Sequence, residues 1–319
     1  MAHSPVLIGT RGSALAITQT TTVAEALSGL GGFEVELVRV RTEGDINRAA
    51  LSQIGGTGVF VAALRESLLR GDCDVAVHSL KDLPTAAAPG LVLGAIPERV
   101  DVRDVLCARD GLTLAGLPAG SKIGTGSPRR AAQLRAARPD LEIVDIRGNV
   151  DTRLGRVAGL VEGAPGDLDA VVLAAAGLAR LGRLGVVTEF IDPAVMLPAP
   201  GQGALAVECR TGDADGGQLA AALAAYDHRD SRLTVAAERA MLGRLEAGCT
   251  APVGALAHVG PDGIRLEAVV CSDDGTRLLR RSSAAAGFTE DAARALGVQV
   301  AEELLAAGAA QLTDLPAGG

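Results

Sequence analysis

Residues 74–85 read Asp-Val-Ala-Val-His-Ser-Leu-Lys-Asp-Leu-Pro-Thr, and this stretch changes character halfway along. Its apolar start, residues 75–77, is typical of a short buried strand, and Ser79, Lys81 and Asp82 follow before a proline. Open α/β sheets place their ligands at the carboxyl ends of strands, so we interpret the Lys–Asp pair as a candidate reactive site. An aspartate beside an ammonium group stays ionised and can stabilise a cation or exchange a proton. A solvated loop is the alternative interpretation.

The composition predicts two or three α/β domains with aliphatic cores. The chain has 319 residues, which exceeds one ordinary core. Apolar residues make up 48% of it but aromatic residues only 2%, and its 41 glycines suit tight turns and close helix–sheet packing. No apolar run reaches the roughly 18–20 residues of a membrane span, and no signal segment opens the chain. We therefore expect a cytoplasmic protein without membrane contact.

Charge and cysteine content exclude several classes of site. The net charge of −8 speaks against nucleic-acid binding, although residues 121–156 carry eight basic and four acidic side chains. That local excess suggests a specific anionic ligand. An odd number of cysteines without CxxC spacing argues against a metal site and against a disulfide framework. Each of the five is expected to be a buried or free thiol and a candidate nucleophile: Cys73, Cys107, Cys209, Cys249 and Cys271.

Arginines follow several predicted strands. Arg11 comes after strand 6–10 and just before Ser13, a candidate N-cap of helix 14–27. The same Ile-Gly-Thr sequence recurs at residues 123–125, where Ser127 is a candidate N-cap and Pro128 fits the first helical position.

Arg129 and Arg130 would then lie in the first turn of a helix, where cations oppose the helix dipole. An anion beside them would explain this placement, and two exposed arginines are the alternative. Arg147 and Arg153 follow strand 142–146, and Arg180 follows strand 169–176. Together these positions favour a cation-lined cleft for carboxylates or phosphates. Neither GxxxxGK[ST] nor GxGxxG occurs, so a nucleotide is less favoured.

The last third of the chain predicts a small α/β module after a turn-rich connector at residues 197–203. Helix 232–245 is expected to end near Gly248, which would leave Cys249 on a loop. Free cysteines in proteins are more often buried and inert than reactive, which favours a buried thiol at Cys249. Sequential, antiparallel strands are predicted at 251–258, 264–272 and 278–284, under a closing helix at 290–307. The remaining elements predicted before this module are strands 33–41, 90–96, 104–108 and 204–208 and helix 61–70.

Six motifs occur in order over nearly the whole chain: IGTRGS at 8–13, VHSLKDLP at 77–84, GTGSPRR at 124–130, IRGNVDTR at 146–153, LPAPGQGA at 197–204, and AERA with LEAGCT at 237–250. Together they resemble the porphobilinogen deaminase (hydroxymethylbilane synthase) family. Each motif alone is a modest signal, whereas the set is very specific.

The resemblance implies a three-domain α/β fold. Two similar domains, built like type-II solute-binding proteins, would comprise residues 1–99 with about 200–219, and residues 100–199. Residues 220–319 would form a small α/β domain with a mainly antiparallel three-stranded sheet, which carries Cys249.

The resemblance also implies a transferase of tetrapyrrole (haem) biosynthesis. The enzyme would join four porphobilinogen molecules head to tail, release ammonia at each addition, and hydrolyse off hydroxymethylbilane. A dipyrromethane cofactor, attached to Cys249 through a thioether, would be the primer. A monomer is implied, and the next pathway enzyme, uroporphyrinogen-III synthase, is a candidate partner.

Residue roles follow from the matching motifs. Asp82 would be catalytic, stabilising positive charge on the azafulvene-like intermediate and assisting proton transfers. Besides Cys249, the implied cofactor-binding residues are Ser13, Ser79, Lys81, Thr125, Ser127, Arg129, Arg130, Arg147 and Arg180. The implied substrate-binding residues are Arg11, Ser13, Arg147, Arg153 and Arg180.

One departure from the family pattern concerns the glycine-rich loop. Family members often carry lysines in and around it, where this chain has Gln53, Thr57 and Ala62. A homologue that keeps the fold but lacks turnover is therefore a second hypothesis. A non-catalytic binding protein for an organic anion is a third, and both the missing signal peptide and the Cys249 module count against it.

Overall fold

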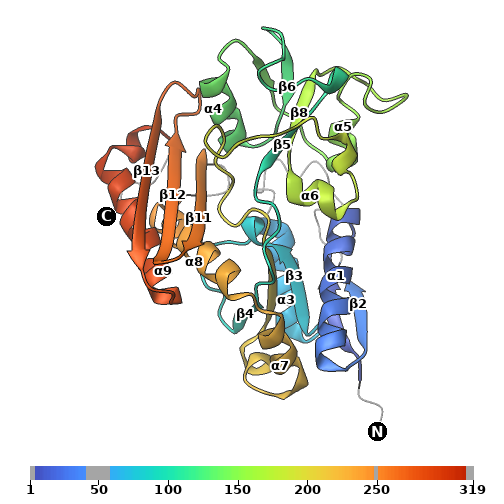
Figure 1. Ribbon diagram of the computed structural model, residues 1–319. Helices are drawn as coiled ribbons and strands as arrows, with labels where there is room; N and C mark the ends of the chain where they lie inside the picture. The colour runs from blue at the N-terminus through green and yellow to red at the C-terminus, as the bar shows by residue number, and fades with distance from the viewer. Residues whose placement is uncertain (1–3, 41–57, 248–250, 314–319) are drawn as a thin grey trace. The chain divides into compact units, whose positions relative to one another are not determined.

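The computed structural model describes residues 4–40, 58–247 and 251–313, and the chain forms two compact units (Figure 1). The first unit comprises Met1–Val100 and Ala204–Arg232, and the second comprises Asp101–Gly203 and Leu233–Gly319. Three sheets organise these units, one in the first and two in the second. The division into three domains near residues 99, 199 and 219 stays a prediction.

The first unit is built on a five-stranded mixed sheet with the order β2-β1-β3-β10-β4. Three neighbouring strands run parallel: β2 (Val35–Arg39), β1 (Val6–Thr10) and β3 (Val75–Ser79). Strand β10 (Leu205–Arg210) runs antiparallel to β3 and also to the edge strand β4 (Leu91–Ala95). The chain therefore returns to its first sheet after passing through the second.

Helices cover both faces of this first sheet because its strands are apolar on both sides. Helices α1 (Ala14–Gly31) and α7 (Gly217–Tyr226) bury Leu27 and Leu223 on one face. Helix α3 (Gly58–Arg70) packs Leu64 and Leu68 on the other. Sequence patterning missed α7, and it predicted α1 four residues too short at its carboxyl end.

The second sheet has the order β7-β6-β8-β5-β9 and repeats the pattern of the first. Its parallel strands are β7 (Glu142–Val144), β6 (Lys122–Gly124) and β8 (Ala170–Ala174), and β5 (Asp104–Ala108) is antiparallel to both β8 and β9 (Glu189–Phe190). Strand order and direction therefore match, with β5 in the place of β10. The two similar α/β halves predicted from the sequence are confirmed.

Three helices cover the second sheet. Helix α4 (Pro128–Ala137) packs on one face, whereas α5 (Val150–Leu154) and α6 (Ala175–Arg180) pack on the other. Single 3-10 turns lie at Leu80–Asp82, Arg109–Gly111, Leu184–Val186, Thr211–Ala214 and Ala309–Gln311.

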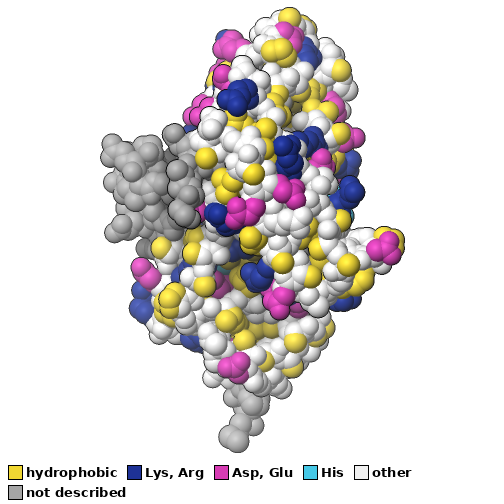
Figure 2. Space-filling model, turned by 90° about the vertical axis from the view of Figure 1, so that its left-hand side faces the viewer, with side chains coloured by type: hydrophobic (Ala, Val, Ile, Leu, Met, Phe, Trp, Pro, Cys, Tyr) yellow, Lys and Arg dark blue, Asp and Glu magenta, His cyan; other side chains and the backbone are white. Residues whose placement is uncertain are grey.

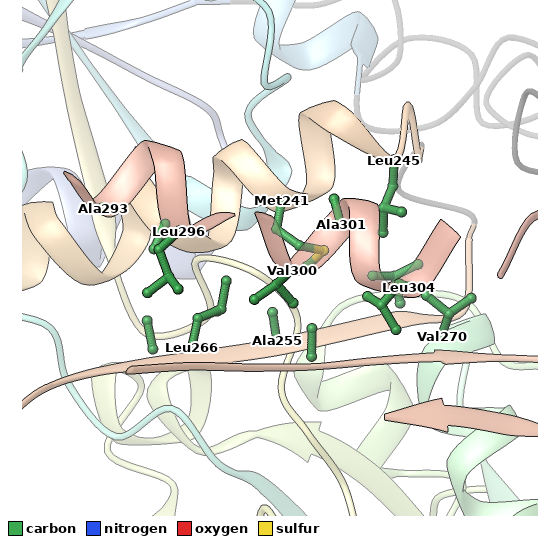
Figure 3. Close-up of a cluster of buried hydrophobic side chains, with 14 of the residues drawn as sticks. Met241, Leu245, Ala255, Leu266, Val270, Ala293, Leu296, Val300, Ala301 and Leu304 are labelled. Atoms are coloured by element: carbon green, nitrogen blue, oxygen red, sulfur yellow. The ribbon is translucent and has the colours of Figure 1, made fainter. Parts of the chain in front are cut away.

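A three-stranded antiparallel sheet forms the predicted carboxyl-terminal module. Its strands are β11 (Val253–Gly260), β12 (Gly263–Cys271) and β13 (Leu278–Ala286), and helices α8 (Arg229–Arg244) and α9 (Glu290–Ala306) cover one face. Figure 3 shows this core, in which side chains of α8 and α9 meet those of the sheet. Its labelled residues are Met241, Leu245, Ala255, Leu266, Val270, Ala293, Leu296, Val300, Ala301 and Leu304.

Helix α8 ends one residue before the predicted Leu245. Its last residue is Arg244, and Glu246 adopts a left-handed conformation with a φ of 51°. The Glu246 N–H donates to Gly243 O and the Ala247 N–H to Leu242 O, which closes the helix end as a glycine usually would. Gly248, the predicted terminator, lies outside the described residues, as does Cys249. No helix in the described ranges has the length and apolar character to span a membrane.

Gly297 allows α8 and α9 to approach closely, so its replacement by Ala should destabilise the fold. A Cβ there would lie 2.2 Å from Ala237 O and 2.8 Å from Met241 N, both backbone atoms of α8. We expect Gly297→Ala to lower the free energy of unfolding by about 1–3 kcal/mol. Gly29→Ala, at an exposed position of α1 where a Cβ meets nothing within 4 Å, should raise the free energy of unfolding by about 0.5–1 kcal/mol. Urea denaturation of both variants checks this, and effects of the same sign would contradict it.

Candidate active site

The turn that follows β3 carries Lys81 and Asp82, and the buried side chain of Leu80 anchors it. Leu80 is fully buried, and its N–H donates to Ala204 O at 3.0 Å. The Leu83 N–H donates to Leu80 O at 3.1 Å, which closes the 3-10 turn. Lys81 and Asp82 stay half-buried between these two leucines. The turn therefore holds a carboxylate and an ammonium group at the carboxyl end of the strand.

The end of β1 lies at the same sheet edge because β1 and β3 are parallel neighbours. Ser13 caps α1, as predicted, with its Oγ accepting from Ala16 N at 3.3 Å. Gln19 of α1 contacts the end of β3, since its Nε2 donates to Ser79 Oγ at 3.2 Å. One edge of the first sheet thus gathers five predicted site residues: Arg11, Ser13, Ser79, Lys81 and Asp82.

A buried charge cluster includes His78, two residues before that turn, and sequence reasoning missed it. Arg65 of α3 binds the Glu208 carboxylate through Nε at 3.1 Å and Nη2 at 2.9 Å. His78 Nε2 lies 3.2 Å from Glu208 Oε2, and the His78 and Glu208 side chains are each 3% exposed. Burial alone would raise the pKa of Glu208, but hydrogen bonds from His78 and Arg65 outweigh it and lower that pKa. These contacts fix β3, β10 and α3 to one another.

In the second unit, the turn after β6 begins α4 as predicted. Ser127 Oγ accepts from Arg130 N at 3.4 Å, Pro128 occupies the first turn, and Thr125 Oγ1 accepts from Ser127 N at 3.2 Å. Arg129 and Arg130 are buried rather than exposed, at 4% and 5%. The alternative of two solvated arginines is therefore wrong.

Asp104 is the anion beside these two arginines. Its Oδ2 accepts from Arg129 Nη1 at 2.7 Å, and its Oδ1 accepts from Arg130 Nη2 at 2.8 Å and from Gln202 Nε2 at 2.9 Å. Burial alone would raise the pKa of Asp104, but Arg129 and Arg130 hold it far below its usual range. A protein carboxylate thus occupies donors that the sequence assigned to a ligand, and the assignment of both arginines to cofactor binding stays a prediction.

Arg147 and Arg153 have more donors left for a ligand. Arg147 is 78% exposed and pairs through Nε with Asp145 at 3.3 Å. Arg153 Nε donates to Gly148 O at 2.8 Å. The pKa of Arg153 is lowered by burial and then by the nearby charges of Arg130 and Arg147. Three guanidinium groups therefore lie close together beyond the parallel strands.

Arg180 lies at the end of α6, which directly follows β8. Its Nη2 donates to Gly203 O at 2.8 Å, so it contacts the connector that leads back to the first unit. The second unit thus carries the remaining predicted residues within the described ranges: Thr125, Ser127, Arg129, Arg130, Arg147, Arg153 and Arg180. Cys249, Gln53 and Thr57 lie outside the described residues, and Ala62 is exposed on α3.

The arrangement offers two complementary functions. A carboxylate at the strand edge of the first unit can stabilise positive charge, and clustered guanidinium groups of the second can hold carboxylates bidentately. Elsewhere no broad basic field is visible on the face drawn in Figure 2, where Lys and Arg side chains are interspersed with Asp and Glu. On this face, the basic side chains therefore form no extended field of the kind that nucleic-acid binding uses.

Comparisons with known proteins agree with this chemistry. The family model "Porphobilinogen deaminase, dipyromethane cofactor binding domain" matches residues 6–217, and "Porphobilinogen deaminase, C-terminal domain" matches residues 232–306. The chain is similar to a protein named porphobilinogen deaminase from Leifsonia xyli, with 58% identity over 97% of this chain and 94% of the relative. One from Cutibacterium acnes is 55% identical, with 99% of both chains covered.

Among solved structures, a periplasmic substrate-binding protein from Coxiella burnetii aligns with a TM-score of 0.43 and 15% identity, covering 69% of this chain and 91% of that one. The family models together span nearly all of the chain, and the relatives match it over almost their full length. The chain belongs to the porphobilinogen deaminase family.

Proposed function

We propose that Asp82 is the catalytic carboxylate of this enzyme and that the arginines of the second unit hold the acidic side chains of its pyrroles. The reaction itself follows from the family: the protein is a transferase that joins four porphobilinogen molecules head to tail, releases ammonia each time, and hydrolyses off hydroxymethylbilane in tetrapyrrole biosynthesis. Its cofactor is dipyrromethane. The match of both family models, in order, carries this conclusion.

Asp82 suits the charge that develops during the reaction. Loss of ammonia leaves positive charge on the substrate pyrrole, and an anion held close to it lowers the barrier. The 3-10 turn holds the Asp82 carboxylate in place through buried Leu80 and Leu83. Lys81, the preceding residue of the turn, would hydrogen-bond a substrate carboxylate. Asp82 would also accept a proton from the coupled ring.

The residues of the second unit fit a dipyrromethane group. Each pyrrole of this family's substrate carries an acetate and a propionate, so the cofactor brings four carboxylates. Arg147 and Arg153 offer donors at one strand edge, since Arg147 is 78% exposed and pairs with Asp145 through Nε, and Arg153 donates to Gly148 O through Nε. Ser127 and Thr125 would add hydrogen bonds. When bound, the group supplies a tethered primer with a free pyrrole position for the next addition.

Cys249 is the proposed attachment site, and the other cysteines support this by their burial. Cys73, Cys107, Cys209 and Cys271 are all buried. Burial raises the pKa of Cys107 and of Cys271 to about 12 and that of Cys209 to about 11. A thiol is nucleophilic as the thiolate, so these four are poor candidates for thioether formation.

Intact mass of the purified protein tests the function and the attachment site together. We expect an increment equal to two porphobilinogen units after loss of ammonia, and we expect Cys249→Ser to abolish it. Cys209→Ser is the matched control, which should keep the increment because Cys209 is buried in the first unit. A folded wild-type chain that stays unmodified when supplied with porphobilinogen would support the homologue without turnover instead.

Three finer points rest on the resemblance alone. A monomeric state, a cytoplasmic location and a contact with uroporphyrinogen-III synthase are proposals. Size-exclusion chromatography with light scattering measures the first, and a dimer mass would contradict it.

A further inference from the structure

Helix α1 buries one stripe of side chains against the first sheet, and this stripe changes character along the helix. Val23, Ala24 and Leu27 are apolar, as is usual for a helix face that packs on a sheet. Gln19 and Thr20, which precede them in the stripe, are polar and only 5% and 1% exposed. Apolar side chains would fill this space without the desolvation cost of a buried amide and a buried hydroxyl. The two polar groups therefore require partners, and both partners lie at strand ends.

Thr20 contacts the end of β1. Its Oγ1 lies 2.8 Å from Thr10 Oγ1 and 2.9 Å from Ala16 O, one turn earlier in the helix. Because a hydroxyl carries one hydrogen, Thr20 can donate to the Ala16 carbonyl while it accepts from Thr10. Thr10 is the last residue of β1 and is 1% exposed, and Arg11 follows it directly. Thr20 thereby fixes the backbone from which Arg11 projects.

Gln19, the preceding residue of α1, contacts the end of β3. Its Nε2 donates to Ser79 Oγ at 3.2 Å, and its Oε1 lies 3.4 Å from the same atom. Ser79 is also the N-cap residue of the 3-10 turn that carries Asp82, yet within the described segment 79–83 its side chain makes no capping hydrogen bond. A serine at an N-cap ordinarily accepts from a backbone N–H of the following turn. Gln19 therefore holds a hydroxyl that would otherwise bind the backbone of this turn.

We propose that Gln19 and Thr20 are positioning residues with separate tasks. Thr20 places Arg11 at the end of β1, and Gln19 places Asp82 by keeping the N-cap hydroxyl away from the turn backbone. Strands β1 and β3 are parallel neighbours, so two consecutive residues of one helix reach both strand ends. This inference rests on the proposed catalytic role of Asp82 and on the implied substrate-binding role of Arg11.

The two contacts lead to different kinetic effects from adjacent substitutions. Thr20→Val keeps the shape of the side chain without its hydroxyl, and we expect KM for porphobilinogen to rise about fivefold while kcat stays within about twofold, because Arg11 acts in binding. Gln19→Met removes the amide, and we expect kcat to fall about tenfold while KM stays within about twofold, because Asp82 acts in the transition state. Rates are normalised to the fraction of enzyme that carries the cofactor mass, so that lower stability alone changes neither constant.

Amide hydrogen exchange of segment 80–83 tests the contact between Gln19 and Ser79 without reference to activity. In Gln19→Met the released hydroxyl can cap the turn, so we expect exchange of this segment to slow about fivefold. In Gln19→Met/Ser79→Ala the cap is impossible, and exchange should return to the wild-type rate. Ser79→Ala alone should also leave that rate unchanged, because the hydroxyl does not bind the turn in the wild type.

Thr22→Ala is the matched control on the same helix. The Thr22 hydroxyl donates to Thr18 O on the exposed side of α1, away from both strand ends. This variant should keep the wild-type values of kcat and KM and the wild-type exchange rate of segment 80–83.

The same change of kcat and KM in Thr20→Val and Gln19→Met would overturn the proposal, as would unchanged exchange in Gln19→Met. If Gln19→Met does not fold, Ser79→Ala decides: faster exchange of segment 80–83 would show that Ser79 caps the turn in the wild type, which rejects the task assigned to Gln19. Failure of the proposed function is visible separately, as a wild-type protein without the cofactor mass. The exchange rates can still be measured in that protein.

Discussion

Replacement of Asp82 by Asn should leave the fold intact and reduce the rate of hydroxymethylbilane formation by about 10²–10⁴-fold. The amide has the same size as the carboxylate, so the turn anchored by Leu80 and Leu83 can form unchanged. It lacks the negative charge that stabilises the cationic pyrrole, and it cannot accept a proton at neutral pH. The rate of product formation, measured beside a thermal melt, checks both parts of the expectation.

Asp72→Asn is the control for the Asp82 variant. Asp72 lies in the same unit, before β3, and its carboxylate pairs with Arg70 on the surface, where it is 50% exposed. This variant should keep wild-type turnover. Near-normal product formation by Asp82→Asn would refute the catalytic role, and a large loss of thermal stability would show that the carboxylate supports the turn instead.

Glu208→Gln should cost about 3 kcal/mol of unfolding free energy at pH 7, because it leaves the buried side of Arg65 without its counter-charge. The pH dependence has a definite sign. The folded-state pKa of Glu208 is lowered, so its stabilisation is fully present above the unfolded pKa and is lost as pH falls through the folded value. The stability gap between wild type and variant should therefore be largest near neutral pH and should shrink below about pH 4.

Urea denaturation at several pH values between 3.5 and 7 measures that gap. The Asp72→Asn variant again serves as control, since exposed ion pairs contribute less than about 1 kcal/mol. A gap that widens on acidification would contradict the assignment of the effect to an ionised Glu208. Equal stability of wild type and Glu208→Gln at pH 7 would mean that His78 and Arg65 are satisfied without it.

Local patterning predicted the strands and caps well because these depend on neighbours in sequence. Strand β5 and the caps Ser13 and Ser127 were placed correctly from a few residues each. The ends of β11 to β13 were predicted within about two residues, since Asp-Gly turn sequences at 262–263 and 274–275 mark where the strands reverse. Helix α7 was missed because its apolar residues follow a glycine-rich stretch without a side-chain cap.

The charge partners could not be predicted because they depend on which strands become neighbours. Asp104 is 25 residues before Arg129, and Glu208 is 143 residues after Arg65. Both acids lie on otherwise apolar strands. From the sequence alone, a single charged residue on such a strand is expected at an exposed edge and not in a buried ion pair. The positive charge after the strands was visible in the sequence, but the carboxylate that shares it was not. The assignment of individual arginines to ligand carboxylates stays a prediction for the same reason.

The position of β10 has a consequence for the order in which the protein can form during synthesis. β10 lies between β3 and β4, yet it is made about a hundred residues after them. A ribosome-bound chain therefore holds an incomplete amino-terminal sheet, with β4 unpaired in it, until the second sheet has been translated. Ala204 O, which accepts from Leu80 N, arrives with the same segment. We expect protection of the Leu80 amide from hydrogen exchange to appear only in nascent chains that extend beyond β10.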